Sequence, residues 1–215
     1  MTQSAHDRHN FLSKGSPLVL VLAILSSLNQ LAAEVPGKES PTLVVDALHD
    51  ALIEVASRSD SLGYESRFAK LEPAIDASHD FPTIARLVGG RFWRELNDHD
   101  RTVFTEAFRR ASIATYAARF TSAEGLQFEK STVQENHGIR ARVRSYLTRT
   151  DGGPIKFEYV LQLTDEEWRI VTILVDGVSD LALQRAELTR IYSGTGFQGV
   201  MEHIEAKAEN ATDGS

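Results

Sequence analysis

The chain has 215 residues, of which 42% are hydrophobic and 25% charged, and its formal net charge is −7. This length suits one domain, and the acidic balance does not favour binding to nucleic acid or to an anionic membrane surface. No cysteine is present, which excludes a disulfide framework and a lipid-modified N-terminal cysteine.

The first 33 residues are typical of an export signal. Arg8 and Lys14 precede an apolar run from Pro17 to Leu28, and Leu31-Ala32-Ala33 offers small residues for cleavage. An apolar run of about a dozen residues is too short to span a bilayer, which needs roughly 20. We expect residues 1–33 to be a cleaved signal peptide and the rest to lie outside the cytoplasm. An uncleaved N-terminal anchor is the alternative.

Helical patterns fill the next part of the chain. Ser40-Pro41 predicts an N-cap and a first helical position, and Asp80 and Asn97 or Asp98 are further cap candidates. Pro73 is expected to kink or split the second helix, and Gly89-Gly90 to end the third. Helices are predicted over Pro41–Val55, Tyr64–Ser78 and Phe81–Val88, as a short turn at Phe92–Leu96, and over Asp98–Phe120.

Alternating strands follow the helices. A first, irregular strand containing Phe128 and Val133 precedes a turn at Gly138. Period-two alternation then predicts strands over Ile139–Thr148, Ile155–Leu163 and Glu167–Val175. The last of these has apolar residues on both sides, which indicates a central strand.

The C-terminal part is predicted to contain two helices, Asp180–Tyr192 and Phe197–Ala208, separated by a glycine break. We expect a single domain over residues 34–208 and a disordered tail over 209–215. The fold class is therefore α+β, with a four-stranded antiparallel curved sheet covered by about six to seven helices.

No catalytic or metal-binding constellation is evident. Gly194–Gly199 matches the dinucleotide fingerprint, but a predicted helix precedes it where that fingerprint needs a strand. No two of the seven histidines have the one-turn spacing of a zinc motif. We therefore predict no cofactor and no metal.

Two sets of polar residues have alternative interpretations. Asp176 ends a strand and could be catalytic, but Asp176 and Ser179 more often accept backbone N–H bonds at such a turn. Arg140, Arg142 and Arg144 share one strand face. They could bind a lipid headgroup, as could Arg91 and Arg94, although a solvated face paired with Glu158 is favoured.

Several loose motifs follow one another between about Leu62 and Lys207. They are Ala85–Trp93, Phe104, Phe108, Tyr116-Ala117, Phe120, Trp168-Arg169-Ile170, Asp176–Ser179, Gln184-Arg185 and Gly194–Phe197. In this order they resemble the MlaC or toluene-tolerance family of periplasmic lipid carriers. The sequences Leu62-Gly63-Tyr64, Leu71-Glu72-Pro73 and Ser179–Ala182 resemble the hopanoid-associated HpnM branch of that family.

This resemblance implies an apolar cavity between the sheet and its helices that accepts acyl chains, and no enzymatic activity. It also implies an inner-membrane ABC transporter with an MCE subunit and an outer-membrane lipoprotein complex as partners. From periodicity alone, a close-packed core is the more ordinary interpretation; a small α+β enzyme acting on an apolar substrate is a further alternative. The predicted lipid-binding residues are Phe92, Trp93, Phe104, Phe108, Tyr116, Phe120, Val143, Phe157, Tyr159, Leu161, Ile170, Leu174, Val178 and Leu181.

Overall fold

The computed structural model describes residues 40–58, 61–150 and 152–213, which belong to one compact unit. The predicted signal peptide lies outside these residues. The described residues form five helices and one open antiparallel sheet of six strands. The helices are α1 (Pro41–Ser57), α2 (Tyr64–Ser78), α3 (Phe81–Trp93), α4 (Asp98–Arg119) and α5 (Asp180–Asp213). The strands are β1 (Gln127–Phe128), β2 (Thr132–Asn136), β3 (Arg140–Arg149), β4 (Gly152–Thr164), β5 (Glu167–Val175) and β6 (Val178–Ser179).

The helices begin where the sequence predicts. The Ser40 hydroxyl accepts a bond from the N–H of Thr42 at the start of α1, where Pro41 is the first helical residue. Asp80 caps α3 and Asn97 caps α4 in the same way. These side chains satisfy backbone donors that have no partner within the helix.

The helix count differs from the prediction. Pro73 lies inside a continuous α2, and the first two residues of the predicted turn at Phe92–Leu96 belong to α3, which ends at Trp93. Gly90 and Gly196 have positive φ angles of 53° and 69°, so each interrupts a helix without ending it. The two predicted C-terminal helices therefore form one element, α5. This helix continues to Asp213, so the predicted disordered tail is helical as far as that residue.

The sheet has the order β1-β3-β4-β5-β6, and β2 also pairs with β3. The single first strand that the sequence predicts is two strands in the structure, β1 and β2, which residues 129–131 separate. There, the hydroxyl of Ser131 donates to the carboxylate of Asp46 on α1 at 2.6 Å. β6 is an additional two-residue strand after the turn at Asp176-Gly177.

A bulge in β5 explains its two apolar sides. The register shifts opposite Val160 and Leu161, which leaves Val171 as the extra residue. Ile170 pairs with Leu161 before the bulge, and Ile173 pairs with Tyr159 after it, so the same sheet face receives apolar side chains on both sides of the bulge. The strand is not central as predicted: only its last two residues pair with β6.

The connection between α2 and α3 joins the helices to this free edge of β5. His79 forms a parallel bridge with Ile170, and the Asp80 N–H donates to the Ile170 carbonyl at 3.0 Å. β5 also contacts α1, α2, α3 and α5. This strand is therefore the main junction between the sheet and the helices.

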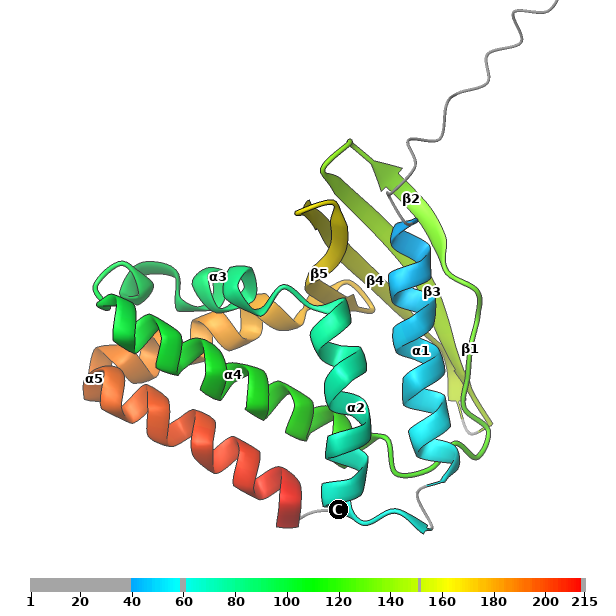
Figure 1. Cartoon of the computed structure of the whole chain (residues 1–215), viewed down its shortest axis with the longest axis horizontal. Coiled ribbons are helices and arrows are strands. Elements are labelled where there is room, and N and C mark those ends of the chain that lie inside the picture. Colours follow the sequence, from blue (N-terminus) through cyan, green and yellow to red (C-terminus); the bar gives the residue numbers. More distant parts are fainter. Residues whose placement is uncertain (1–39, 59–60, 151, 214–215) are drawn as a thin grey trace, which may run out of the picture. The chain divides into compact units, whose positions relative to one another are not determined.

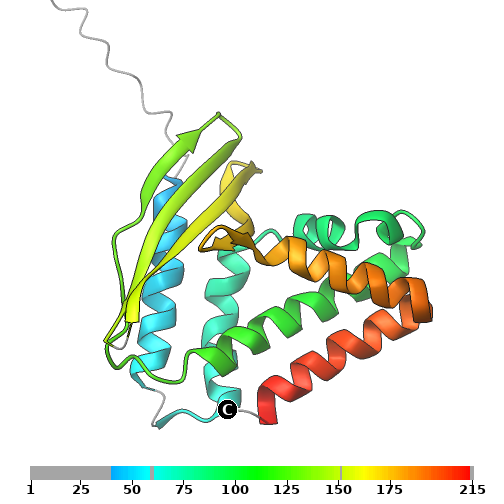
Figure 2. The same cartoon turned by 180° about the vertical axis from the view of Figure 1, so that it is seen from behind.

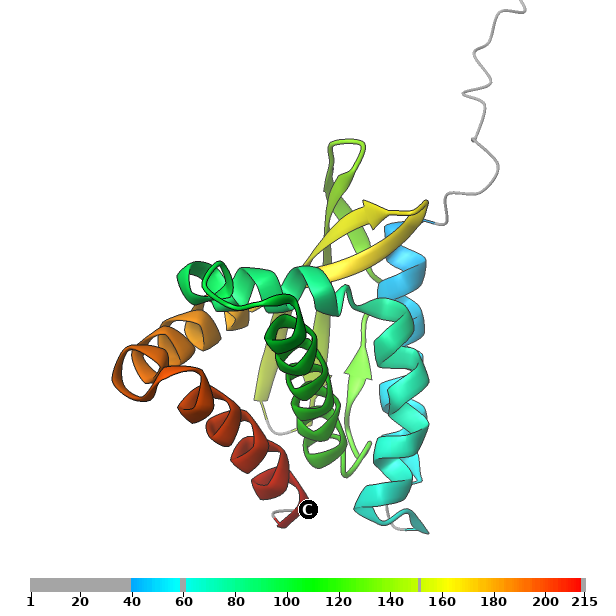
Figure 3. The same ribbon diagram turned by 60° about the vertical axis from the view of Figure 1, so that its left-hand side comes forward.

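The helices form two groups around the sheet. Figure 1 shows α1 and α2 side by side near the strands, and α3, α4 and α5 extending to the other side. From behind, the first half of α5 runs away from the sheet and its second half returns below α4 (Figure 2). The view in Figure 3 shows α4 between α2 and α5, and α4 contacts both helices. None of the described helices is long and apolar enough to cross a membrane.

Replacing Gly90 by alanine should lower the free energy of unfolding by about 1–3 kcal/mol, because the residue has positive φ. An added Cβ would also lie 2.7 Å from Nε of Arg185 on α5. Gly63→Ala is the matched control, because its φ is −65° and its Cβ would meet nothing within 4 Å. Denaturant unfolding measures the free energy of unfolding of both variants. If Gly90→Ala is as stable as the parent, the positive φ at Gly90 is contradicted.

Candidate functional site

A cavity of about 780 Å³ lies between the inner face of the sheet and the helices. Its walls come from α1, α3, α4, both halves of α5 and strands β1, β3, β4 and β5. This volume lies within the range of about 300–1,000 Å³ that is usual for small-molecule sites. The predicted cavity is therefore present, and the filled-core alternative does not describe this molecule.

The floor of the cavity is almost entirely apolar. Among its lining residues, those that are buried are hydrophobic except His79 and Tyr159. The apolar ones are Leu48, Leu52, Phe81, Ile84, Val88, Phe108, Ala111, Leu147, Ile170, Val171, Leu188 and Ile204. Hydrocarbon placed here would be removed from water, which is favourable by about 0.8 kcal/mol per methylene.

The rim of the cavity is polar and exposed. It includes Arg119 at the end of α4, Glu124 in the following loop and Arg149 at the end of β3. Asp180 at the start of α5 and Lys207 near its end also line the cavity and are exposed. Within the described part of the chain, Arg119 and Lys207 have no ion-pair partner, which leaves two cations available to a bound group. The sequence analysis did not single out any of these rim residues.

Seven of the predicted residues line the cavity. They come from both layers, α4 and α5 on the helical side and β4 and β5 on the sheet side. They are Phe108, Tyr116, Phe120, Phe157, Tyr159, Ile170 and Leu181.

The other predicted residues do not line it. Phe92 and Phe104 are buried against each other with ring centroids 5.5 Å apart, and Trp93 packs on Phe104. Val143 and Leu161 are fully buried in the layer between α1 and the sheet. Leu174 pairs with Glu158 and Val178 is 55% exposed. An apolar helical or strand pattern predicts burial, but it does not tell a packed neighbour from a cavity.

Small residues on α4 are a sequence signal that could have pointed to the cavity. Ala111, Ser112 and Thr115 line it. Short side chains at these positions leave space where larger ones would fill it.

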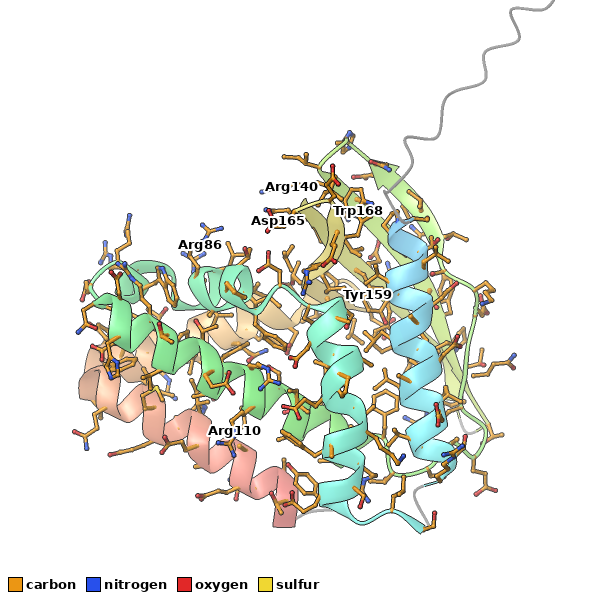
Figure 4. All side chains as sticks on the ribbon, viewed as in Figure 1. Arg86, Arg110, Arg140, Tyr159, Asp165 and Trp168 are labelled. Atoms are coloured by element: carbon orange, nitrogen blue, oxygen red, sulfur yellow. The ribbon has the colours of Figure 1, made fainter. Side chains whose placement is uncertain are left out.

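Two histidine–tyrosine pairs lie at the cavity. Nε2 of His49 is 2.8 Å from the hydroxyl of Tyr159, and the His49 ring stacks on Phe128 at 3.8 Å. Nε2 of His79 is 3.4 Å from the hydroxyl of Tyr116. Figure 4 labels Tyr159 on the sheet, beside the helical layer. Tyr116, Phe128 and Tyr159 also line the cavity.

Burial keeps these groups uncharged. Desolvation lowers the pKa of His49 to about 4; the charge of Asp46 opposes this shift, and the charge of Lys130 adds to it. Desolvation also lowers the pKa of His79 to about 4, opposed by the bond to the Ile75 carbonyl and by Asp76. It raises the pKa of Tyr116 and of Tyr159. The interior therefore carries neutral imidazoles and phenols at neutral pH.

The other polar candidates have structural roles. The carboxylate of Asp176 accepts the N–H of Lys156 at 3.0 Å, and the hydroxyl of Ser179 accepts the N–H of Ala182 at 3.2 Å, as the turn interpretation predicts. Arg144 lies 3.8 Å from Glu158 across the β3–β4 hairpin. Figure 4 places Arg140 near Asp165 and Trp168, at the opposite end of β3 from Arg149.

The glycine-rich segment is part of a helix. Residues 194–199 lie within α5 and follow helix, not strand, so the dinucleotide interpretation is wrong for this segment. Among the residues that the structure describes, no group of three or more His, Cys, Asp or Glu side chains could hold a metal ion.

The fold and the cavity define an α+β protein with an internal apolar site, and comparisons with known proteins agree. The family model "MlaC protein" matches residues 46–206, and the chain therefore belongs to the MlaC family, as its motifs indicated.

One similar solved structure is the phospholipid-binding protein from Ralstonia solanacearum in complex with a phospholipid. It matches with a TM-score of 0.71 at 15% identity, covering 80% of this chain and 99% of that chain. At this identity the likeness establishes the shared fold. A comparison with curated proteins finds no match.

The two buried histidines make stability depend on pH. Between pH 6.5 and about 4, the unfolded chain binds protons that the folded protein does not, so the free energy of unfolding falls as pH decreases through this window. Each histidine contributes about 3 kcal/mol to this fall.

Replacing His79 by glutamine should therefore remove about half of that pH dependence. Denaturant unfolding at pH 6.5 and at pH 4, the two limits of the window, measures the difference. If the free energy of unfolding of His79→Gln falls with decreasing pH as steeply as that of the parent, the lowered pKa of His79 is contradicted. The same measurement on His49→Gln should give a similar loss.

Proposed function

We propose that this protein is a periplasmic carrier that binds a phospholipid or hopanoid in its cavity and transfers it between the inner and outer membranes. The observation that carries the proposal is the cavity itself, with an apolar floor and a polar rim, in a member of the MlaC family. The phospholipid-bound protein of the same fold supports it.

Apolar burial is sufficient for this function. Ten methylenes moved from water to the cavity floor supply roughly 8 kcal/mol before the cost of association. No chemical step is needed. Hydrophobic pockets distinguish single methylenes by only about 1–3 kcal/mol, so the shape of the lipid should matter more than small differences in chain length.

The proposed lipid contacts are the predicted residues that line the cavity, with the headgroup near Arg119 and Lys207. Arg119 and Lys207 suit a phosphate, and the other exposed lining residues Glu124 and Asp180 suit an ammonium group. The proposed partners are an inner-membrane ABC transporter with an MCE subunit and an outer-membrane lipoprotein complex, in line with the family resemblance.

Filling part of the cavity should weaken lipid binding. Thr115 lies on α4 and lines the cavity, so Thr115→Trp would occupy part of the volume that the lipid needs. We expect at least about a tenfold loss of affinity, equivalent to about 1.4 kcal/mol. Native mass spectrometry of the purified protein and rebinding after delipidation measure the effect.

Thr105→Trp is the matched control. Thr105 is on the same helix and does not line the cavity, and both hydroxyls donate to the carbonyl four residues earlier at 2.8 Å. This variant should bind lipid like the parent. If the parent never carries or rebinds lipid, or if both variants lose binding equally, the proposed function is wrong.

Removing the rim cations should weaken binding of an anionic lipid. The double variant Arg119→Gln/Lys207→Gln should bind phosphatidylglycerol about three- to tenfold more weakly at low salt, because exposed charge pairs contribute about 0.2–1 kcal/mol each. The difference should shrink at high salt.

Arg86→Gln/Arg140→Gln removes the same charge from residues that do not line the cavity (Figure 4), and is the control. Equal weakening by both double variants would show a general effect of net charge and contradict a headgroup site at this rim.

A further inference from the structure

We propose that Tyr116 and Tyr159 form a polar subsite inside the cavity that binds an uncharged hydroxyl group on the hydrocarbon body of the lipid. This inference rests on the proposed function and specifies the class of lipid. The two tyrosines come from opposite layers, α4 and β4, and line the same cavity.

The subsite extends inward from the charged rim. Tyr116 is half-buried and lies one turn of α4 from the rim residue Arg119, whereas Tyr159 is 2% exposed. The two tyrosines interact electrostatically with each other. A headgroup held at the rim by Arg119 and Lys207 therefore leaves the hydroxyl of Tyr159 to a deeper part of the ligand, where most of the surrounding side chains are apolar.

The hydrogen bonds of His79 determine whether the hydroxyl of Tyr116 can donate to a ligand or accept from it. Nδ1 of His79 lies 3.1 Å from the carbonyl of Ile75 and 2.9 Å from the hydroxyl of Ser78. A carbonyl only accepts, so Nδ1 carries the proton and Nε2 of the neutral ring is an acceptor. The hydroxyl of Tyr116 therefore donates to Nε2, over a long contact of 3.4 Å. Its oxygen keeps free lone pairs and can accept a bond from a ligand.

Tyr159 can donate a hydrogen bond to a ligand, whereas Tyr116 can accept one. Nδ1 of its partner His49 is buried and has no hydrogen-bond partner in the described structure. A buried N–H without a partner is rarer and more costly than an unpaired acceptor, which assigns the proton to Nε2. Nε2–H then donates to the Tyr159 oxygen at 2.8 Å, and the Tyr159 hydroxyl is free to donate to a ligand.

A hydroxyl group suits both tyrosines, because a single oxygen can donate to Tyr116 and accept from Tyr159. A ketone or ester carbonyl can only accept and would leave Tyr116 unsatisfied. A carboxylate or ammonium would be a charge buried among neutral partners, which is strongly unfavourable. A plain hydrocarbon would bury both hydroxyls without a new bond.

Two series of probes test whether the cavity prefers a hydroxyl group, and whether that group belongs to an acyl chain or to a rigid polycycle. Stearate, mid-chain oxostearate and mid-chain hydroxystearate vary an acyl chain. Cholestane, cholestanone and cholestanol vary a rigid polycycle. The purified, delipidated protein should prefer the hydroxylated member of at least one series by about fivefold or more over the other two members, as expected for hydrogen bonds in a buried site.

The variants Tyr116→Phe and Tyr159→Phe remove only the hydroxyls. Tyr116→Phe should abolish the preference for alcohol over ketone, whereas Tyr159→Phe should reduce binding of both alcohol and ketone. Each substitution should change the binding of stearate and of cholestane by less than it changes the binding of the matching alcohol. Tyr146→Phe is the matched control, because Tyr146 pairs with Lys156 on β4 and does not line the cavity. Thermal unfolding of each variant verifies that it is folded.

A preference in the acyl series alone points to hydroxylated acyl chains as the source, and one in the polycyclic series alone to polycyclic alcohols. If the parent binds stearate or cholestane but does not prefer the alcohol in either series, the inference is wrong and the carrier function stands. A preference that survives both tyrosine substitutions also overturns it. If no probe binds at all, the carrier function fails and this inference fails with it.

Discussion

The structure depends on how its sheet and its helices are held together while a hollow remains between them. Protein interiors are normally close-packed, with few voids larger than a water molecule, and this chain has no cysteine with which to staple its layers. The junction is instead made along β5, where His79 and Asp80 bond to the edge of the strand at Ile170. The apolar groups that would fill the interior of an ordinary domain line an open space here.

The packed regions on either side of the cavity explain its persistence. Phe92 and Phe104 are buried where α3, α4 and α5 meet, and Val45 and Val143 are buried where α1 meets the sheet. These clusters hold the helices in place without help from the cavity floor. Small residues on α4, including Ala111, then leave the volume open. The neutral histidine–tyrosine pairs are the main polar contacts at this interior.

The sequence predicts much of the secondary structure but not which apolar faces line the cavity. Cap residues such as Ser40, Asp80 and Asn97 act locally, and the alternation in β3 and β4 depends only on which face is covered, so both could be predicted. The bulge at Val171 depends on pairing with β4, and the continuity of α5 across Gly196 depends on the helix packing around it. Phe92 and Phe108 have similar sequence patterns, and only the tertiary fold directs one to the packed core and the other to the cavity.

The central claim is that the space between the layers holds the hydrocarbon of a lipid. A crystal structure of the protein purified with its natural ligand tests this most directly. The account predicts continuous hydrocarbon density between Thr115 and Tyr116 of α4 and the inner faces of β4 and β5, with the polar end at the rim near Arg119 and Lys207. A cavity closed by side chains, or lipid density confined to the outer surface, would contradict it.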